Sequence, residues 1–113
     1  MTKQRYLDIE NAVLVGLLEA TEHGEDPFKV DTDIFTTQLK KKIATTINKY
    51  IDDGEAYMAM YKFINAVDED PILQDEWIHI QEKTYNILPV STIKRYYDDL
   101  IVEYKAKIAK ETR

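Results

Sequence analysis

Two histidines, with the acidic residues near them, are the side chains in this sequence best suited to hold a metal ion. His23 stands beside Glu22 and near Glu25 in the segment EHGED, and imidazole with carboxylates suits Zn²⁺ or Mn²⁺. The spacing matches no closed ligand set, so we expect a solvated polar loop. His79 and Glu82 stand three apart on a predicted helix, an arrangement used in di-metal bundles. Because such bundles need a second matching copy, which is missing here, we predict a surface histidine.

The run of three lysines from Lys40 to Lys42 raises the question of phosphate binding. Three consecutive residues on a helix fan over about 200°, so these lysines do not form one patch. With Leu39 and Ile43 expected to face inward, we predict that the lysines lie on the solvent side.

Catalytic chemistry has little support in this sequence. Cysteine is absent, which excludes disulfides, thiolate metal sites and a cysteine nucleophile. No serine, threonine or lysine has a recognisable activating neighbour, and there is no glycine-rich phosphate loop. We therefore expect a protein that is not an enzyme and that holds no cofactor or metal.

The eight tyrosines are the one compositional excess. Tyrosine combines apolar area with a polar tip, so it suits both the edge of a core and a binding surface. Tyr96 and Tyr97 are adjacent and point about 100° apart on a helix, so one of them is expected to face away from the local core. Packing with a solvated hydroxyl and a role in an interface are equally compatible with this composition.

Length and charge bound the remaining possibilities. A chain of 113 residues, 44% hydrophobic and 32% charged, is typical of one modest folded domain. The net charge of −6 disfavours nonspecific binding to nucleic acid, although the segment from residue 93 to 113 carries six basic and four acidic residues. The N-terminal MTKQRY does not resemble a signal peptide, and no apolar run approaches the ~20 residues that span a bilayer. We expect a cytoplasmic protein.

The segment from Asp31 to Gly54 is predicted to be one complete helix. Asp31 or Asp33 can cap its first turn, and Gly54 can adopt the left-handed conformation that ends it. Inside it, apolar residues recur at steps of three and four, namely Leu39, Ile43, Ile47, Tyr50 and Ile51.

Four further helices are predicted around it, at about 4–22, 55–67, 71–88 and 92–110. The first has an apolar stripe broad enough to pack on more than one neighbour, and Phe28 and Val30 are expected to pin the loop that follows it. Asp70 with Pro71 is a favoured start for the fourth helix. One side of the third helix is predicted to carry Tyr57, Met60, Tyr61, Ile64 and Val67, and Met58 and Phe63 add apolar surface on other sides of that helix. No segment shows the alternation of a strand, so the predicted fold is an all-α bundle of about five helices.

Two stretches resemble the N-terminal domain of DnaB-type replicative helicases. The family opens with Glu, a small residue, Ala-Val-Leu-Gly and a leucine pair, and residues 9–18 of this sequence read IENAVLVGLL. Here Val15 separates Leu14 from Gly16. The second stretch, Asp33-Ile34-Phe35 followed by residues 39–55, is similar to the family's Asp-Phe and a helix that ends in Gly-Glu. In this chain Ala44 and other small residues replace an Ile-Phe pair, and a lysine replaces a histidine.

Beyond Glu55 the match fades, and the C-terminal half looks a little like the helicase-binding domain that ends bacterial primases. The two domain types share a fold, a helical bundle followed by a helical hairpin. The resemblance implies a single domain over residues 1–113, with the bundle at about 1–70 and the hairpin at about 71–113. No motor domain follows, so we expect either an excised domain or a stand-alone relative.

The function that this resemblance implies is interaction within the DNA replication machinery. The helicase domain builds a collar of paired subunits and docks primase, so we expect a homo-oligomer or a complex with primase or replicative helicase. Neither direct nucleic-acid binding nor a membrane is expected. The predicted partner interface, on the hairpin of the last two helices, comprises Trp77, Tyr96, Tyr97, Leu100, Ile101, Tyr104 and Ile108.

Three alternatives stay open. The domain could instead be the helicase-binding domain of a primase. A metal-dependent helical enzyme would use His23 or His79. A small nucleic-acid-binding or regulatory protein would use the basic residues near the C-terminus, which are Lys94, Arg95, Lys105, Lys107 and Lys110.

Overall fold

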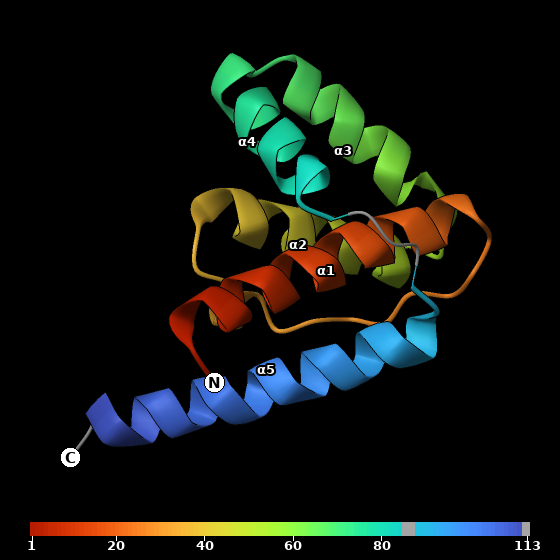
Figure 1. Cartoon of the computed structure of the whole chain (residues 1–113). Coiled ribbons are helices and arrows are strands. Elements are labelled where there is room, and N and C mark those ends of the chain that lie inside the picture. Colours follow the sequence, from red (N-terminus) through yellow and green to blue (C-terminus); the bar gives the residue numbers. More distant parts are fainter. Residues whose placement is uncertain (85–87, 112–113) are drawn as a thin grey trace.

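Helix α1, Lys3–Glu22, is the element on which the others pack (Figure 1). It begins after Thr2, whose hydroxyl accepts a hydrogen bond from the Arg5 amide and so satisfies a free N–H of the first turn. Every residue from Val13 to Leu18 is buried, which means that the middle of this helix is covered all round. The predicted helix and its contact with several neighbours are both confirmed.

The expected long helix from Asp31 begins later than predicted. Asp31 caps only a 3-10 turn, η1 (Thr32–Ile34), and the chain is extended at Phe35. Helix α2, Gln38–Asp52, begins after Thr37, whose side chain accepts a hydrogen bond from the Lys40 amide. The end was predicted correctly, since Gly54 has φ +72°, the left-handed conformation that glycine adopts without strain.

Two short helices then form an antiparallel pair that stands on α1 and α2 (Figure 1). A second 3-10 turn, η2 (Ala56–Met58), leads directly into α3 (Ala59–Asp68). Helix α4, Pro71–Glu82, has the expected start, because the Asp70 carboxylate accepts from the amides of the first turn. It ends before the predicted Leu88, and residue 87 lies outside the residues that the structure describes, which are 1–84 and 88–111.

Helix α5, Val90–Glu111, runs antiparallel along α1 on the side away from α3 and α4 (Figure 1). Its buried residues are Ile93, Tyr97 and Leu100. Gly16 of α1 permits the close approach, since a Cβ there would lie 2.6 Å from Cδ1 of Ile93. The glycine inside the first helix therefore has a packing role.

The structure, a computed structural model, is all-α: it has five α-helices and no strand among the described residues. This confirms the predicted fold class. The expected hairpin of the last two helices is wrong, however, because α4 packs on α3 while α5 packs on α1, and no Cα atom in the described part of α4 lies within 8 Å of one in α5. The buried residues of each of these helices already pack against an earlier helix, so neither helix needs the other.

Candidate functional site

Three of the seven residues predicted to meet a partner are buried within this chain. Trp77 packs edge-on against Phe63 with ring centroids 4.9 Å apart. Tyr97 lies beneath the loop after α1, where its hydroxyl accepts a hydrogen bond from the Asp31 amide at 2.8 Å. Leu100 is fully buried. The core of this chain already buries the apolar area of these three residues, and a partner role for them stays a prediction.

The other four predicted interface residues lie along α5. Tyr96, Ile101 and Tyr104 are half-buried, and Ile108 is exposed. Of the two adjacent tyrosines, Tyr97 faces the core and Tyr96 turns partly away from it, as the helical geometry predicts. A partner role for these four remains a prediction.

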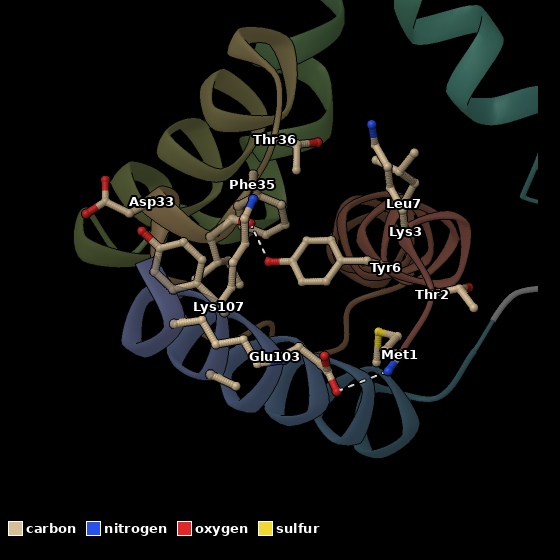
Figure 2. A pocket seen from close by; sticks show the side chains of 14 residues that line it. Met1, Thr2, Lys3, Tyr6, Leu7, Asp33, Phe35, Thr36, Glu103 and Lys107 are labelled. Carbon is tan, nitrogen blue, oxygen red and sulfur yellow. Dashed lines mark hydrogen bonds and ion pairs between the residues drawn. The ribbon is translucent and has the colours of Figure 1, made fainter. Parts of the chain in front are cut away.

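A cavity of about 800 Å³ lies between the start of α1, η1 and the C-terminal half of α5 (Figure 2). Its aromatic lining comes from Tyr6, Phe35 and Tyr104. The Tyr6 hydroxyl donates a hydrogen bond to the Ile34 carbonyl at 2.7 Å. Figure 2 shows the Lys3 side chain pointing away from this hydroxyl. The tyrosine side chain therefore connects α1 to η1, and its polar atom is already used.

Burial, and to a lesser degree the nearby acidic groups Glu10, Tyr104 and Glu103, together raise the pKa of Tyr6 to about 12. At neutral pH the hydroxyl is therefore fully protonated and acts as a hydrogen-bond donor. As a protonated donor, the Tyr6 hydroxyl suits a structural contact. Nothing in the sequence periodicity signalled the cavity, because its walls come from three distant segments.

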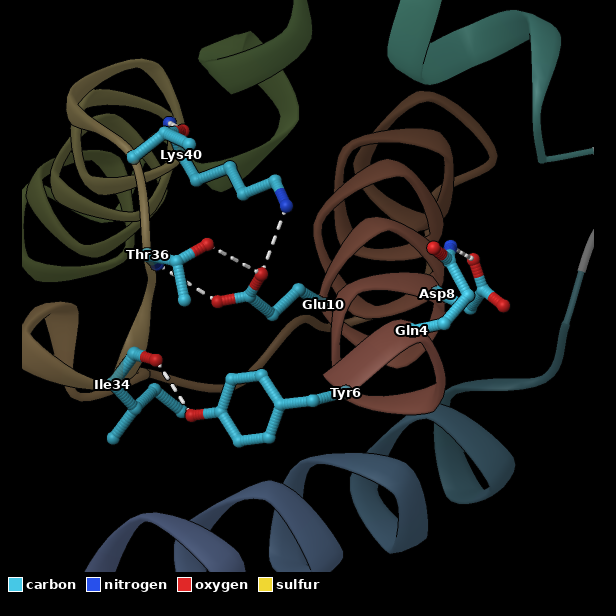
Figure 3. Close-up of polar contacts among 8 residues, drawn as sticks. Gln4, Tyr6, Asp8, Glu10, Ile34, Thr36 and Lys40 are labelled. Atoms are coloured by element: carbon cyan, nitrogen blue, oxygen red, sulfur yellow. Dashed lines mark hydrogen bonds and ion pairs between the residues drawn. The ribbon is translucent and has the colours of Figure 1, made fainter. Parts of the chain in front are cut away.

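Among the side chains that the structure describes, the most buried polar one is that of Glu10, whose carboxylate is fully inaccessible (Figure 3). One of its oxygens, Oε1, accepts from the Thr36 amide at 2.8 Å. The other, Oε2, accepts from the Thr36 hydroxyl at 2.9 Å and from Nζ of Lys40 at 2.8 Å. A buried charge is tolerated when it is paired and hydrogen-bonded in this way.

This cluster corrects the prediction for the lysine run. Lys40 is buried and paired with Glu10, whereas Lys41 is half-buried and Lys42 is exposed. The expectation of three solvent-facing lysines is therefore wrong for Lys40. The pair joins the first stretch of the family resemblance to the second, since Glu10 belongs to one and Lys40 to the other.

The two histidines occupy exposed positions. His23 caps the end of α1 through its backbone, and His79 lies in the last turn of α4. Among the residues that the structure describes, no group of three acidic or imidazole side chains is placed to hold a metal ion. Over the same residues, no helix is both long and apolar enough to cross a membrane.

Exposed apolar side chains concentrate on η2, α3 and α4. Of the eight large hydrophobic residues that are exposed in the described chain, five lie between residues 57 and 78. These five are Tyr57, Tyr61, Ile64, Ile72 and Ile78. We call the first three of them, which follow one another at steps of four and three, the tyrosine stripe.

The sequence pattern gave an incomplete account of this helix. Tyr61 and Ile64 are exposed, although they fall on the same side of the sequence pattern as the buried Met60 and Val67. Phe63, which seemed to face elsewhere, is fully buried against Trp77. The apolar residues of α3 cover a wider sector of the helix than the part that faces the core. The apolar side chains outside that part are exposed to water.

No protein-family model, curated protein or solved structure matches this sequence.

Proposed function

We propose that this chain is a protein–protein interaction domain of the DNA replication machinery, of the helicase N-terminal type, without catalysis of its own. The observation that carries the proposal is the concentration of exposed large apolar side chains on η2, α3 and α4. Clustered apolar groups that a domain leaves in water, rather than burying, typically mark a site of association. Tyrosine is also among the residue types enriched at protein interfaces.

The assignment to replication is supported by the resemblance at residues 9–18 and 33–55. In this fold those stretches determine packing. Glu10 anchors the segment before α2, and Gly16 makes room for Ile93 of α5. Residues with such roles support a shared helical scaffold, and the exposed surface lies mainly in the half where the resemblance fades. A common scaffold with its own binding surface fits an adaptor that has one particular partner.

The charge of the exposed region favours protein over nucleic acid as the partner. Residues 52–70 contain six acidic residues and one basic residue, a net charge of −5. Because phosphate groups would be repelled by this surface, we propose that it contacts primase or replicative helicase rather than DNA. Self-association through the same domain type is the second form that the interaction can take.

Light scattering at micromolar concentration, together with a pull-down against purified primase and purified replicative helicase, tests this function. We expect either a mass above that of the 13.3 kDa chain or retention of one of the two proteins on the immobilised domain. Beads that carry an unrelated acidic helical protein serve as the control. A strict monomer that retains neither protein would contradict the proposal.

A further inference from the structure

The geometry points to a specific occupant for the tyrosine stripe: we propose that it binds a basic amphipathic helix of a partner protein. This inference rests on the proposal that the chain is an interaction domain, but it does not depend on a place in replication. It commits to one surface and to one chemistry of partner, each of which follows from exposed groups on η2 and α3.

The stripe runs from η2 into α3. Tyr57 and Tyr61 are 68% and 70% exposed, and Ile64 is 39% exposed. Tyr61 and Ile64 are three apart in α3, so they lie next to one another along one side of that helix, and Tyr57 precedes them in the 3-10 turn η2. The exposed isoleucines of α4 do not extend this stripe in the same way, since Ile72 and Ile78 are six residues apart and point about 120° away from each other.

Both ends of the stripe are acidic. Asp53 and Glu55 precede Tyr57, and Asp68 follows Ile64 in the last turn of α3. All three carboxylates are exposed, and none of them is in an ion pair with any described residue. Asp68 accepts only a long hydrogen bond, 3.4 Å, from the neutral side chain of Gln74. These charges are available to cations on a partner.

A helix is the form of partner that this surface can accept. The backbone groups of α3 are already bonded within the helix, so it offers side chains and no free edge for an extended peptide. A partner helix satisfies its own backbone and can lay apolar residues across Tyr57, Tyr61 and Ile64. Basic residues at its two ends would then meet Asp53, Glu55 and Asp68. The same acidic ends disfavour an anionic membrane surface, to which apolar side chains alone would otherwise be attracted.

The test uses the full chain and three synthetic helical peptides of equal length, followed by fluorescence anisotropy of a labelled peptide. The first peptide has leucines at helical spacing and lysines at both ends. In the second, glutamate replaces every lysine. The third has the composition of the first in an order that destroys its apolar face. We expect micromolar binding of the first peptide alone, weakened by added salt because exposed charges are screened.

Two pairs of variants locate the binding. Tyr61→Ala removes the centre of the stripe, and Val102→Ala is its control, since Val102 is 66% exposed but lies on α5, which does not contact α3. We expect the first substitution to weaken peptide binding by on the order of tenfold and the second to leave it unchanged. Circular dichroism of each variant confirms that the fold is retained.

The second pair separates local charge from net charge. The acidic ends are neutralised in the triple variant Asp53→Asn, Glu55→Gln and Asp68→Asn. Its control neutralises three exposed carboxylates elsewhere, through Glu22→Gln, Asp99→Asn and Glu111→Gln. Both variants change the net charge equally, so only loss of binding confined to the first supports the stripe.

Equal binding of the scrambled peptide, preference for the acidic peptide, or insensitivity to Tyr61→Ala would overturn the inference. So would concentration-dependent dimerisation that Tyr61→Ala abolishes, because the occupant would then be a second copy. Since no replication protein enters this experiment, peptide binding without retention of primase or helicase would refute the replication role and leave the stripe intact. If the Tyr61→Ala variant still retains primase or helicase, the replication role would stand and the binding role of the stripe would be refuted.

Discussion

Replacing Lys40 with methionine should destabilise the fold far more than the same change at Lys42. Nζ of Lys40 lies 2.8 Å from Glu10 Oε2, and both side chains are buried, so the substitution leaves a carboxylate in the interior with only the two donors of Thr36. Breaking a buried pair from one side typically costs about 3–5 kcal/mol. Lys42 is exposed, and its replacement should change the free energy of unfolding by no more than about 0.5 kcal/mol.

Urea unfolding, followed by far-ultraviolet circular dichroism and by the fluorescence of the single tryptophan, Trp77, measures both effects. The slope of free energy against urea should be unchanged, since the same surface unfolds. Adding Glu10→Gln to Lys40→Met removes the unpaired charge but keeps an oxygen that can accept from Thr36. The double variant should therefore be more stable than the sum of the two single effects. A loss below about 1 kcal/mol for Lys40→Met, or strictly additive effects, would refute the role given to this pair.

Two further predictions concern α1. Gly16→Ala should destabilise the chain by about 1–3 kcal/mol, despite the better helix propensity of alanine, because the new Cβ would collide with Cδ1 of the fully buried Ile93. Ile93→Val removes that atom, so it should reduce the cost of Gly16→Ala in the same unfolding assay. Tyr6→Phe should cost about 1 kcal/mol at neutral pH through loss of the hydrogen bond to Ile34. Because the pKa of Tyr6 is raised from 10.0 to about 12 by folding, the folded state holds this proton more tightly. The stability advantage over Tyr6→Phe should be complete below pH 10 and should decline as the pH rises toward 12; an advantage that is constant over this range would contradict the shift.

Local signals were sufficient for most of the helices. The breadth of the first apolar stripe reflects contact with α2, α3, α4 and α5, and the Asp70–Pro71 pair and Gly54 were read correctly because caps and left-handed glycines act within one turn. The start of α2 was missed because Asp31 and Thr37 are both competent caps. The sequence alone could not show which of them the longer helix would use.

The features that depend on distant segments were not predictable in this way. Lys40 looked like a solvent-facing residue, since its inward turn depends on Glu10, thirty residues earlier. Tyr97 is buried because it meets the Asp31 amide, which lies 66 residues away along the chain. The wrong hairpin has the same origin, because periodicity identifies an apolar face without naming the helix that covers it. The candidate interaction surface was likewise hidden, since Tyr61 and Met60 look equally apolar in sequence although only Met60 is buried.

Sedimentation velocity of the chain mixed with purified primase or replicative helicase tests the central claim most directly. The wild-type chain and the Val102→Ala control should co-sediment with one of the two proteins, and the Tyr57→Ala, Tyr61→Ala double variant, folded by circular dichroism, should sediment alone. Co-sedimentation of the double variant to the same extent as the wild type would contradict the account, and so would a wild-type chain that sediments as a monomer with neither protein.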